Sequence, residues 1–254
     1  MPPPDADLHP SATGAAQATV AAHSTPQALK LYSGWFCPFV QRVWLVLEEK
    51  GIPYQYIEVN PYHKPESLLK LNPRGLVPTL EYDGKPLYES TVICEFLEDA
   101  YPDHAGRGVG LRPEEPYEVA KGRIWMDFVG SRVIPAFQRF LQWQPGETGV
   151  SVEEVRGELH KMVLQFAEAM DPEGPYFFGE EPMLVDFVAA PFALRFWVFD
   201  EFKSGGFGAP EAGKGAEREQ GWARWRKWVE AMEGRRSVRE TTSERKHYLP
   251  IYQR

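Results

Sequence analysis

The chain has 254 residues, 43% of them hydrophobic, and a formal net charge of −8. That length is enough for one large domain or two small ones. The negative charge disfavours nucleic acid or an anionic membrane as a general partner, and no uninterrupted apolar stretch approaches the ~20 residues that span a bilayer. Two cysteines are too few for a disulfide framework, which predicts a reducing compartment, by default the cytoplasm.

The first 27 residues differ in composition from the rest of the chain. Residues 1–27 are rich in Pro, Ala, Thr and Ser and contain no Lys or Arg. Because they also lack a long apolar run, neither a signal peptide nor an Arg-rich transit peptide fits. We predict a disordered tail over 1–27.

Residues 28–102 carry the pattern of a small α/β layer. A strand-like segment leads into an amphipathic helix that starts at Pro38 and ends before Gly51, both of which suit those positions. A second strand, a short helix, a hairpin with a tight turn and a further helix follow, which is the order of one compact α/β domain. The expected elements are strand 29–32, helix 38–50, strand 54–59, helix 65–71, strands 79–82 and 85–88, and helix 89–100.

From Pro113 onward long helical patterns dominate and no convincing strand appears. We predict a linker over 103–112 and an all-helical domain over 113–254. A glycine-rich loop at 204–215 imitates a phosphate-binding loop, but it lacks the following Ser or Thr and a preceding strand. The expected helices are 117–143, 152–170, 185–202 and 221–233.

Cys37 lies between the first expected strand and the helix that begins at Pro38. Backbone N–H groups and the positive end of the helix dipole favour a thiolate there. A dithiol motif would carry a second cysteine three residues on, where this chain has Val40. The pattern therefore indicates a one-thiol redox or transfer centre that takes its second thiol from solution, with a buried structural thiol as the alternative. Cys94 is expected to point inward and is assigned no chemistry.

Three motifs in order carry a family resemblance. Cys37-Pro38-Phe39 before a helix, Gly75-Leu76-Val77-Pro78 before a hairpin, and Tyr88-Glu89-Ser90 opening a helix resemble the glutathione transferase superfamily. A cysteine in place of a serine or tyrosine is similar to the omega class, and the C-terminal sequence resembles fungal omega-like members. The resemblance implies a glutathione transferase fold, which is a thioredoxin-like N-terminal domain over 28–102 followed by an all-helical domain with an acceptor-substrate pocket.

The resemblance also implies a glutathione site. The peptide bond of Val77-Pro78 would be cis, and the backbone of Val77 would pair with the cysteinyl part of glutathione, as an extended peptide pairs with a strand edge. The Ser90 hydroxyl and the helix N-terminus would take the α-carboxylate of the γ-glutamyl group, and Glu89 would take its ammonium. Ordinary roles for these residues are a loop–strand junction and a helix N-cap.

Further residues are assigned by the same resemblance. Lys64 resembles the family lysine that meets the glycyl carboxylate, although a solvated surface charge is the alternative, and Arg74 is a second candidate for that end. Phe39 is read as packing that also touches glutathione. Three of the aromatic residues on the predicted helices are candidates for the walls of an acceptor pocket between the domains, with a place in the core as the alternative: Trp125, Phe128 and Trp222. No metal site is expected, because the histidines show no ligand spacing.

One departure from the family pattern concerns a helix start. Family members place Ser or Thr three residues before the residue that is Asp186 here, as an N-cap, whereas this chain has Met183. Losing such a cap costs about 0.5–2 kcal/mol, which puts the local stability of that helix in question.

The resemblance implies glutathione as co-substrate and the activities of an omega-type enzyme. These are thiol transfer, dehydroascorbate reduction and reductive removal of glutathione from adducts, through a mixed disulfide at Cys37, with weak conjugating activity. A homodimer is expected by analogy. The alternatives are a non-enzymatic glutathione-fold binding or regulatory module and a glutathionyl-hydroquinone reductase, which usually has tryptophan where this chain has Phe39.

Overall fold

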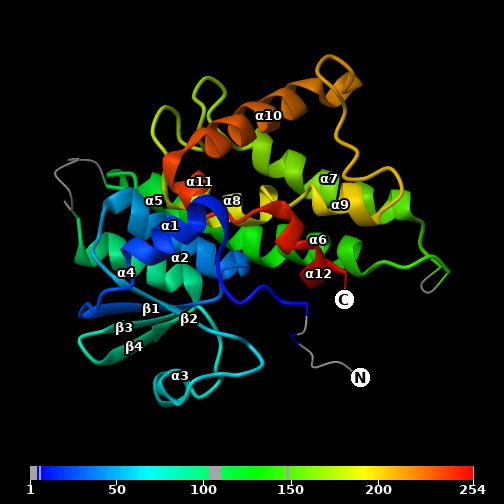
Figure 1. The fold of residues 1–254 in the computed structure, drawn as a ribbon. Coiled ribbons are helices and arrows are strands. Elements are labelled where there is room, and N and C mark those ends of the chain that lie inside the picture. Colours follow the sequence, from blue (N-terminus) through cyan, green and yellow to red (C-terminus); the bar gives the residue numbers. More distant parts are fainter. Residues whose placement is uncertain (1–4, 6, 103–109, 147–148, 254) are drawn as a thin grey trace. The chain divides into compact units, whose positions relative to one another are not determined.

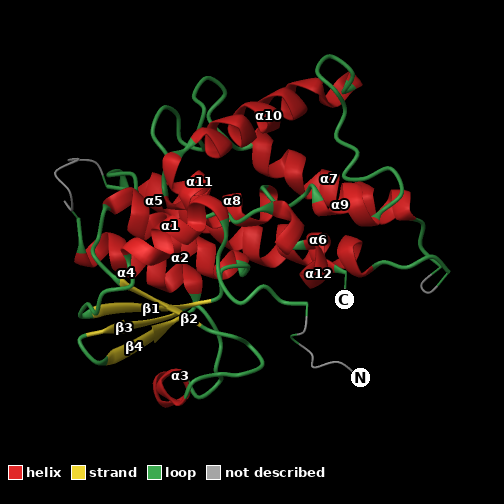
Figure 2. Ribbon diagram, viewed as in Figure 1, coloured by secondary structure: helices red, strands yellow, loops and turns green. Residues whose placement is uncertain are grey.

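The computed structural model describes residues 5, 7–102, 110–146 and 149–253. The chain divides into two compact units. One unit contains residues 1–110 together with 235–254, and the other contains residues 111–234 (Figure 1). The first unit holds the sheet, and the described part of the second holds helices without a named strand (Figure 2).

The sheet of the first unit has four strands in the order β2-β1-β3-β4. Strand β1 pairs parallel with β2 and antiparallel with β3, which pairs antiparallel with β4. In the β1–β2 register, Ser33 lies opposite Glu58. This mixed sheet confirms the expected α/β fold, with strands β1 (Leu29–Ser33), β2 (Gln55–Glu58), β3 (Thr79–Tyr82) and β4 (Lys85–Tyr88).

Helices cover both faces of this sheet, as Figure 2 shows. Helices α2 (Pro38–Lys50) and α4 (Ser90–Ala100) lie on one face, and α3 (Glu66–Leu71) lies on the other. Leu68 of α3 packs there with Tyr32 and Val59. Helix α2 ends at Gly51, whose φ of +62° is the left-handed conformation that a glycine C-cap adopts without steric cost.

The N-terminal segment differs from the disordered tail predicted over 1–27. The structure contains helix α1 (Gly14–Ala22), in which Ala16 and Thr19 are buried. Thr13 joins it to the C-terminus, since its N–H donates to Ser243 Oγ and its Oγ1 accepts from the Glu244 N–H, each at 3.0 Å. The composition of residues 1–27 predicted disorder, because small residues form only a weak apolar face. In the structure two small residues of α1, Ala16 and Thr19, are instead buried against the rest of the unit.

The C-terminal residues also correct the predicted boundary of the helical domain, which was placed at 113–254. Residues 235–254 belong to the first unit. The buried carboxylate of Glu49 on α2 pairs with Arg235, whose Nε donates at 2.8 Å, and also accepts from Ser237 Oγ. Such a buried carboxylate needs charged or hydrogen-bonding partners, and this segment supplies them. It contains α11 (Arg236–Glu240), η4 (Arg245–His247) and α12 (Leu249–Tyr252).

The second unit is built from helices around an aromatic core. The helix expected over 117–143 is continuous but contains a π-helical turn, η2 (Val129–Val133), just before Pro135. Proline has no N–H for the regular ladder, which accounts for the widened turn. The remaining elements are α5 (Pro116–Phe128), α6 (Ile134–Gln142), α7 (Val152–Glu168), α8 (Leu184–Ala193), α9 (Val198–Phe202), η3 (Ala216–Arg218) and α10 (Glu219–Gly234).

The single helix predicted over 185–202 is wrong, because the structure has α8 and α9 with a break between them. The N–H groups of Arg195 and Phe196 donate to carbonyl oxygens three residues back rather than four. The Arg195 guanidinium donates to the carbonyl oxygen of Pro191. Most of the predicted linker, residues 103–109, lies outside the described residues. Among the helices described, none combines the length and apolar character needed to cross a membrane.

The start of α8 shows how the missing N-cap is replaced. Met183 has no hydroxyl, but its N–H donates to Asp186 Oδ2 at 2.8 Å. Asp186 Oδ1 also accepts from the Phe177 N–H at 2.9 Å and from Trp228 Nε1 at 2.7 Å. Burial raises the pKa of this carboxyl to about 6, and the hydrogen bonds from these donors oppose that rise. The Asp186 half of the capping box is therefore present, and the buried carboxylate also ties the helix start to its neighbours.

Candidate active site

Cys37 is the N-cap residue of α2, as the sequence predicts. The Cys37 N–H donates to the Gly34 carbonyl at 2.9 Å, so residues 34–37 form a tight turn. The Cys37 carbonyl accepts from the Gln41 N–H at 3.0 Å, which is the first bond of the helix. The side chain is partly exposed. The thiol therefore stands at the positive end of a helix of 13 residues, where an anion is favoured.

Cys94 differs from Cys37 in burial. It lies inside α4 with no exposed surface, and burial raises the pKa of its thiol to about 12. A neutral, enclosed thiol is a poor nucleophile. The structure thus separates one accessible cysteine from one inert cysteine.

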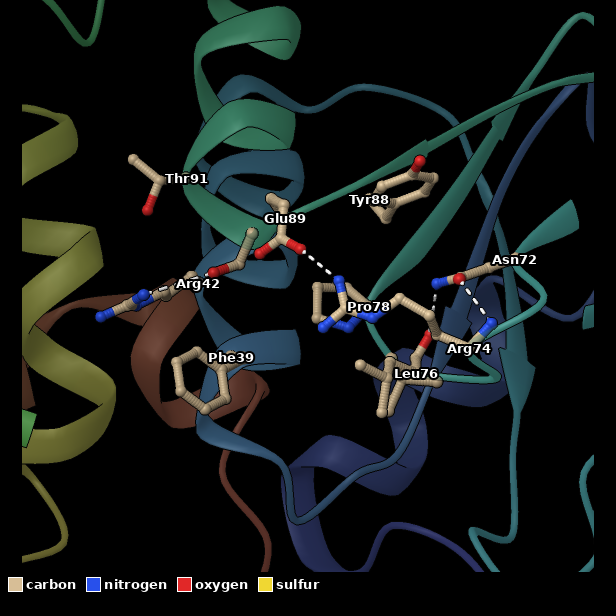
Figure 3. A pocket seen from close by; sticks show the side chains of 11 residues that line it. Phe39, Arg42, Asn72, Arg74, Leu76, Pro78, Tyr88, Glu89 and Thr91 are labelled. Atoms are coloured by element: carbon tan, nitrogen blue, oxygen red, sulfur yellow. Dashed lines mark hydrogen bonds and ion pairs between the residues drawn. The ribbon is translucent and has the colours of Figure 1, made fainter. Parts of the chain in front are cut away.

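A cavity of about 380 Å³ borders the start of α2 and brings together residues that are distant in sequence. Figure 3 shows its lining side chains, which come from α2, the loop before β3, the end of β4 and the start of α4. Its volume falls in the range of about 300–1,000 Å³ that is usual for small-molecule sites. Cys37 is not among the lining residues, but six other predicted residues are: Phe39, Arg74, Val77, Pro78, Glu89 and Ser90.

The loop between α3 and β3 forms one wall of this cavity. The Val77–Pro78 peptide bond is cis, as the resemblance implies. Asn72, which is buried, holds the loop, because its Nδ2 donates to Thr79 Oγ1 at 3.0 Å and its Oδ1 accepts from the Arg74 N–H at 3.1 Å. The loop is therefore fixed from within, and its backbone borders the cavity.

Glu89 and Ser90 lie at the opposite wall, where α4 begins. Glu89 has a φ of +71°, an uncommon conformation for a non-glycine residue and one that is frequent at ligand sites. Its exposed carboxylate accepts from Arg74 Nη1 at 2.9 Å, the contact drawn as a dashed line in Figure 3. Ser90 is 7% exposed and sits at the N-terminus of α4. A cation and an anion of one ligand could be bound side by side here.

Arg42 is a cavity residue that the sequence analysis missed. Its side chain is 3% exposed, its Nη1 donates to Ser90 Oγ at 3.3 Å, and its guanidinium carbon lies 5.1 Å from the centre of the Phe39 ring. Burial lowers the pKa of Arg42 to about 10, and the charges of Cys94 and Cys37 oppose this decrease. The guanidinium is thus a fixed cation at neutral pH. The available signal was a single charge inside the apolar run Val40–Leu47.

Lys64 lies beside the cavity rather than in its lining. Its side chain covers Gly75, where an added Cβ would meet Lys64 Cδ at 2.8 Å and Nζ at 3.2 Å. Gly75 also has a φ of +60°, which is the firmer reason for glycine here, because the flexible Lys64 side chain could move aside. Lys64 is exposed, and Leu76, the residue after Gly75, lines the cavity.

The three aromatic residues predicted for an acceptor pocket lie in two groups within the helical unit. Trp125 is half-buried and contacts Phe128 edge-on, with ring centres 4.9 Å apart. Trp222 is 4% exposed and packs against His160, with ring centres 4.9 Å apart. A cavity of about 500 Å³ between α7 and α10 includes none of the three in its lining. Their role in binding an acceptor stays a prediction.

Two protein-family models match the chain, and one of them spans the residues of the cavity. The model described as the N-terminal domain of glutathione S-transferase matches residues 36–100, and the C-terminal domain of glutathione S-transferase matches residues 150–231. The first match begins one residue before Cys37 and spans the whole cavity lining.

Individual proteins agree with the family models. Glutathione transferase Omega 3C from Trametes versicolor has a solved structure that is 42% identical, covers 93% of this chain and 99% of its own, and superposes with a TM-score of 0.79. Glutathione S-transferase omega-1 of Sus scrofa is 36% identical over 169 residues, which is 66% of each chain. A rice glutathione transferase, solved in complex with glutathione, shares the fold with 22% identity, 90% and 98% coverage, and a TM-score of 0.74.

The chain belongs to the glutathione transferase family. Its omega-class relatives show which branch of the family it resembles.

Proposed function

We propose that the protein is a glutathione-dependent thiol transferase of omega type, in which Cys37 forms a mixed disulfide with glutathione. The observation that supports this most is the position of Cys37, a partly exposed thiol at the N-terminus of α2, two residues before Phe39, which lines the cavity. A serine or tyrosine there would activate bound glutathione for conjugation, whereas a thiolate attacks sulfur and forms a disulfide.

Glutathione would bind with its γ-glutamyl end between Glu89 and Ser90. Its α-carboxylate would accept from the Ser90 hydroxyl and the first N–H groups of α4, with the Arg42 guanidinium behind Ser90 as a fixed positive charge. Its ammonium would approach the Glu89 carboxylate, which accepts a hydrogen bond from Arg74. The backbone of Val77 would pair with the cysteinyl unit, which directs the sulfur toward Cys37, and Lys64 would reach the glycyl carboxylate.

The reaction then takes two disulfide exchanges. The Cys37 thiolate attacks the glutathionyl sulfur of a mixed disulfide, a Cys37–glutathione disulfide forms, and the substrate leaves as a thiolate that takes up a proton. A second glutathione, as its thiolate, attacks the glutathionyl sulfur of that intermediate and releases Cys37 as a thiolate with oxidised glutathione. In total the mixed disulfide and one free glutathione give the substrate thiol and oxidised glutathione, so one disulfide bond breaks for the one that forms. Dehydroascorbate and glutathione adducts would be reduced through the same intermediate.

The proposed activity is tested by replacing the thiol. Cys37→Ser should abolish reduction of a small glutathione mixed disulfide, and Cys94→Ser, the matched control, should leave it unchanged. Incubation with oxidised glutathione followed by intact-mass and peptide analysis should place one glutathionyl group on Cys37. Unchanged turnover by Cys37→Ser, or modification at Cys94 alone, would refute the mechanism.

The alternative of a binding or regulatory module predicts different measurements. It would show no glutathione binding by calorimetry and a Cys37 alkylation rate that follows the pH dependence of free cysteine. A cytoplasmic location and a homodimer are further proposals, supported by two unbridged cysteines and by the family, respectively. Fractionation and sedimentation test them.

A further inference from the structure

A carboxyl group that the proposed reaction does not use holds the turn in front of Cys37. Glu58 ends β2 and lies opposite Ser33, the last residue of β1. Its Oε1 accepts from the Trp35 backbone N–H at 3.1 Å. Its Oε2 is buried and has no hydrogen-bond partner among the described residues. The Oε2 end of the acid is therefore enclosed, while its Oε1 accepts from a backbone amide two residues before Cys37.

Trp35 connects Glu58 to the turn and is itself held on other sides. It is 2% exposed, its indole Nε1 donates to the His9 carbonyl at 2.9 Å, and its ring packs edge-on against Tyr248 with centres 5.0 Å apart. The turn closes through the bond from Cys37 N–H to Gly34 oxygen. Only two residues lie between Gly34 and Cys37. The position of the Trp35 amide therefore restricts the position of Cys37 at the start of α2.

We propose that Glu58 is a positioning residue for Cys37, which fixes the turn through the Trp35 N–H more firmly when its carboxyl is ionised than when it is protonated. The inference rests on the proposed role of Cys37 as the reacting thiol. An ionised acceptor forms a stronger hydrogen bond to an N–H than a neutral one. Ionisation of Glu58 should then increase the fraction of molecules in which Cys37 stands at the helix start.

The ionisation falls in the working range of pH. Burial raises the pKa of Glu58 to about 7, while the Trp35 N–H and the Tyr56 phenol lower it. Burial, together with the Glu58 charge, raises the pKa of Tyr56 far above neutrality, so this phenol stays protonated.

The other groups that face Trp35 and Glu58 come from the two chain ends and from β1. Tyr248 lies against the Trp35 ring, and its electrostatic interaction raises the pKa of Tyr56. A hydrogen bond with the Ser33 hydroxyl lowers the pKa of the same phenol. The imidazole of His9 lies with its ring centre 6.4 Å from that of Trp35, and the His247 ring lies 4.3 Å from that of His9. Because the His9 ring lies near Trp35, a variant at His9 is needed as a control.

The test compares Cys37 alkylation by iodoacetamide in wild type, Glu58→Gln and Glu58→Leu, each carrying Cys94→Ser, between about pH 5.5 and pH 8.5. Glutamine keeps a neutral oxygen acceptor, and leucine removes it. The ratio of the wild-type rate to the Glu58→Gln rate should start near unity and rise about fivefold with a midpoint near pH 7. Glu58→Leu should be slower than both throughout.

A spectroscopic measurement reads the same contact without the thiol. The Trp35 amide proton should move downfield with a midpoint near pH 7 in wild type and should not titrate in Glu58→Gln. Tyr56→Phe and His9→Gln, the matched controls, should retain the titration. This measurement remains possible if Glu58→Leu fails to fold, because it needs only the wild type and the glutamine variant.

Two results would overturn the inference. One is a rate ratio that does not change with pH, and the other is a wild-type rate that falls below the Glu58→Gln rate as pH rises, because the carboxylate would then act as a repelling charge on the thiolate. The proposed function fails separately: if Cys37→Ser retains thiol transfer while the alkylation ratio rises as expected, the turn is controlled by Glu58 but the reaction does not use Cys37.

Discussion

Replacing Asp186 should destabilise the helical unit strongly, because its carboxylate is the acceptor for three N–H donors at the start of α8. Two of them, the Phe177 N–H and the Trp228 indole, are fully buried, and the third is the Met183 N–H. With its pKa raised to about 6 by burial, Asp186 is ionised at about pH 7.5, where the measurement should be made.

The magnitude follows from those donors. Asp186→Ala leaves the two buried donors unpaired at about 1–3 kcal/mol each, and the relief of a buried charge offsets part of this, so we expect a loss of about 3–4 kcal/mol. Asp186→Asn keeps Oδ1 for Phe177 and Trp228 but turns an NH₂ group toward Met183, so the expected loss is about 1–2 kcal/mol. Either loss is a large share of the about 5–15 kcal/mol that stabilises a domain.

Urea unfolding followed by tryptophan fluorescence measures these losses, and hydrogen exchange at the Phe177 amide localises them. Asp171 offers a matched control, because its Oδ1 also accepts two backbone N–H groups, at 2.9 Å and 2.7 Å, but in an exposed turn. Asp171→Ala should lose less stability than Asp186→Ala. The reasoning is refuted if Asp186→Ala unfolds within about 1 kcal/mol of wild type, or if the asparagine and alanine variants are equally unstable.

Three further results are expected. At about pH 8 iodoacetamide should label Cys37 alone in the native protein and both cysteines in denaturant, because burial raises the pKa of Cys94 to about 12; equal native labelling by peptide mass mapping would contradict this. Although burial opposes it, the Glu48 carboxylate raises the pKa of His23 above 6.5, so its stabilisation is fully present below pH 6.5 and is lost as pH rises through the higher native value. Urea unfolding should show that wild type loses more stability than His23→Gln over that interval, and parallel curves would exclude the contribution. Ser90→Ala should weaken glutathione binding about tenfold by calorimetry while leaving the fold intact, and unchanged affinity would remove Ser90 from the site.

Part of the candidate site could be predicted because its signals are local. Cys37 at a strand–helix junction, and Glu89-Ser90 at the start of a helix, are recognisable from neighbouring residues alone, and the structure places Glu89 and Ser90 in one cavity with Phe39, two residues after Cys37. Arg42 could not be predicted in this way. Its spacing places it on a helix, where an arginine is ordinarily solvated, and only packing against Phe39 and Ser90 shows that it is buried.

The fold shows the same division. Alternation and helical periodicity predicted the positions of the strands and of α2 to α4, because the apolar face of each element is visible as a periodic pattern in its own residues. The helix at 14–22 and the end of the helical domain were mispredicted, because both depend on contacts that join residues about two hundred positions apart, such as Thr13 with Ser243 and Gln41 with Thr241.

The sequence by itself determined the order of secondary structure over residues 28–102, the place of Cys37 at the start of a helix and the family of this protein, since these follow from short patterns and their spacing. Only the tertiary structure decided which charges are enclosed. Arg42, Glu58 and Asp186 have ordinary sequence contexts, yet burial changes the pKa of each. Desolvation depends on everything packed around a group, so it arises only when distant segments meet.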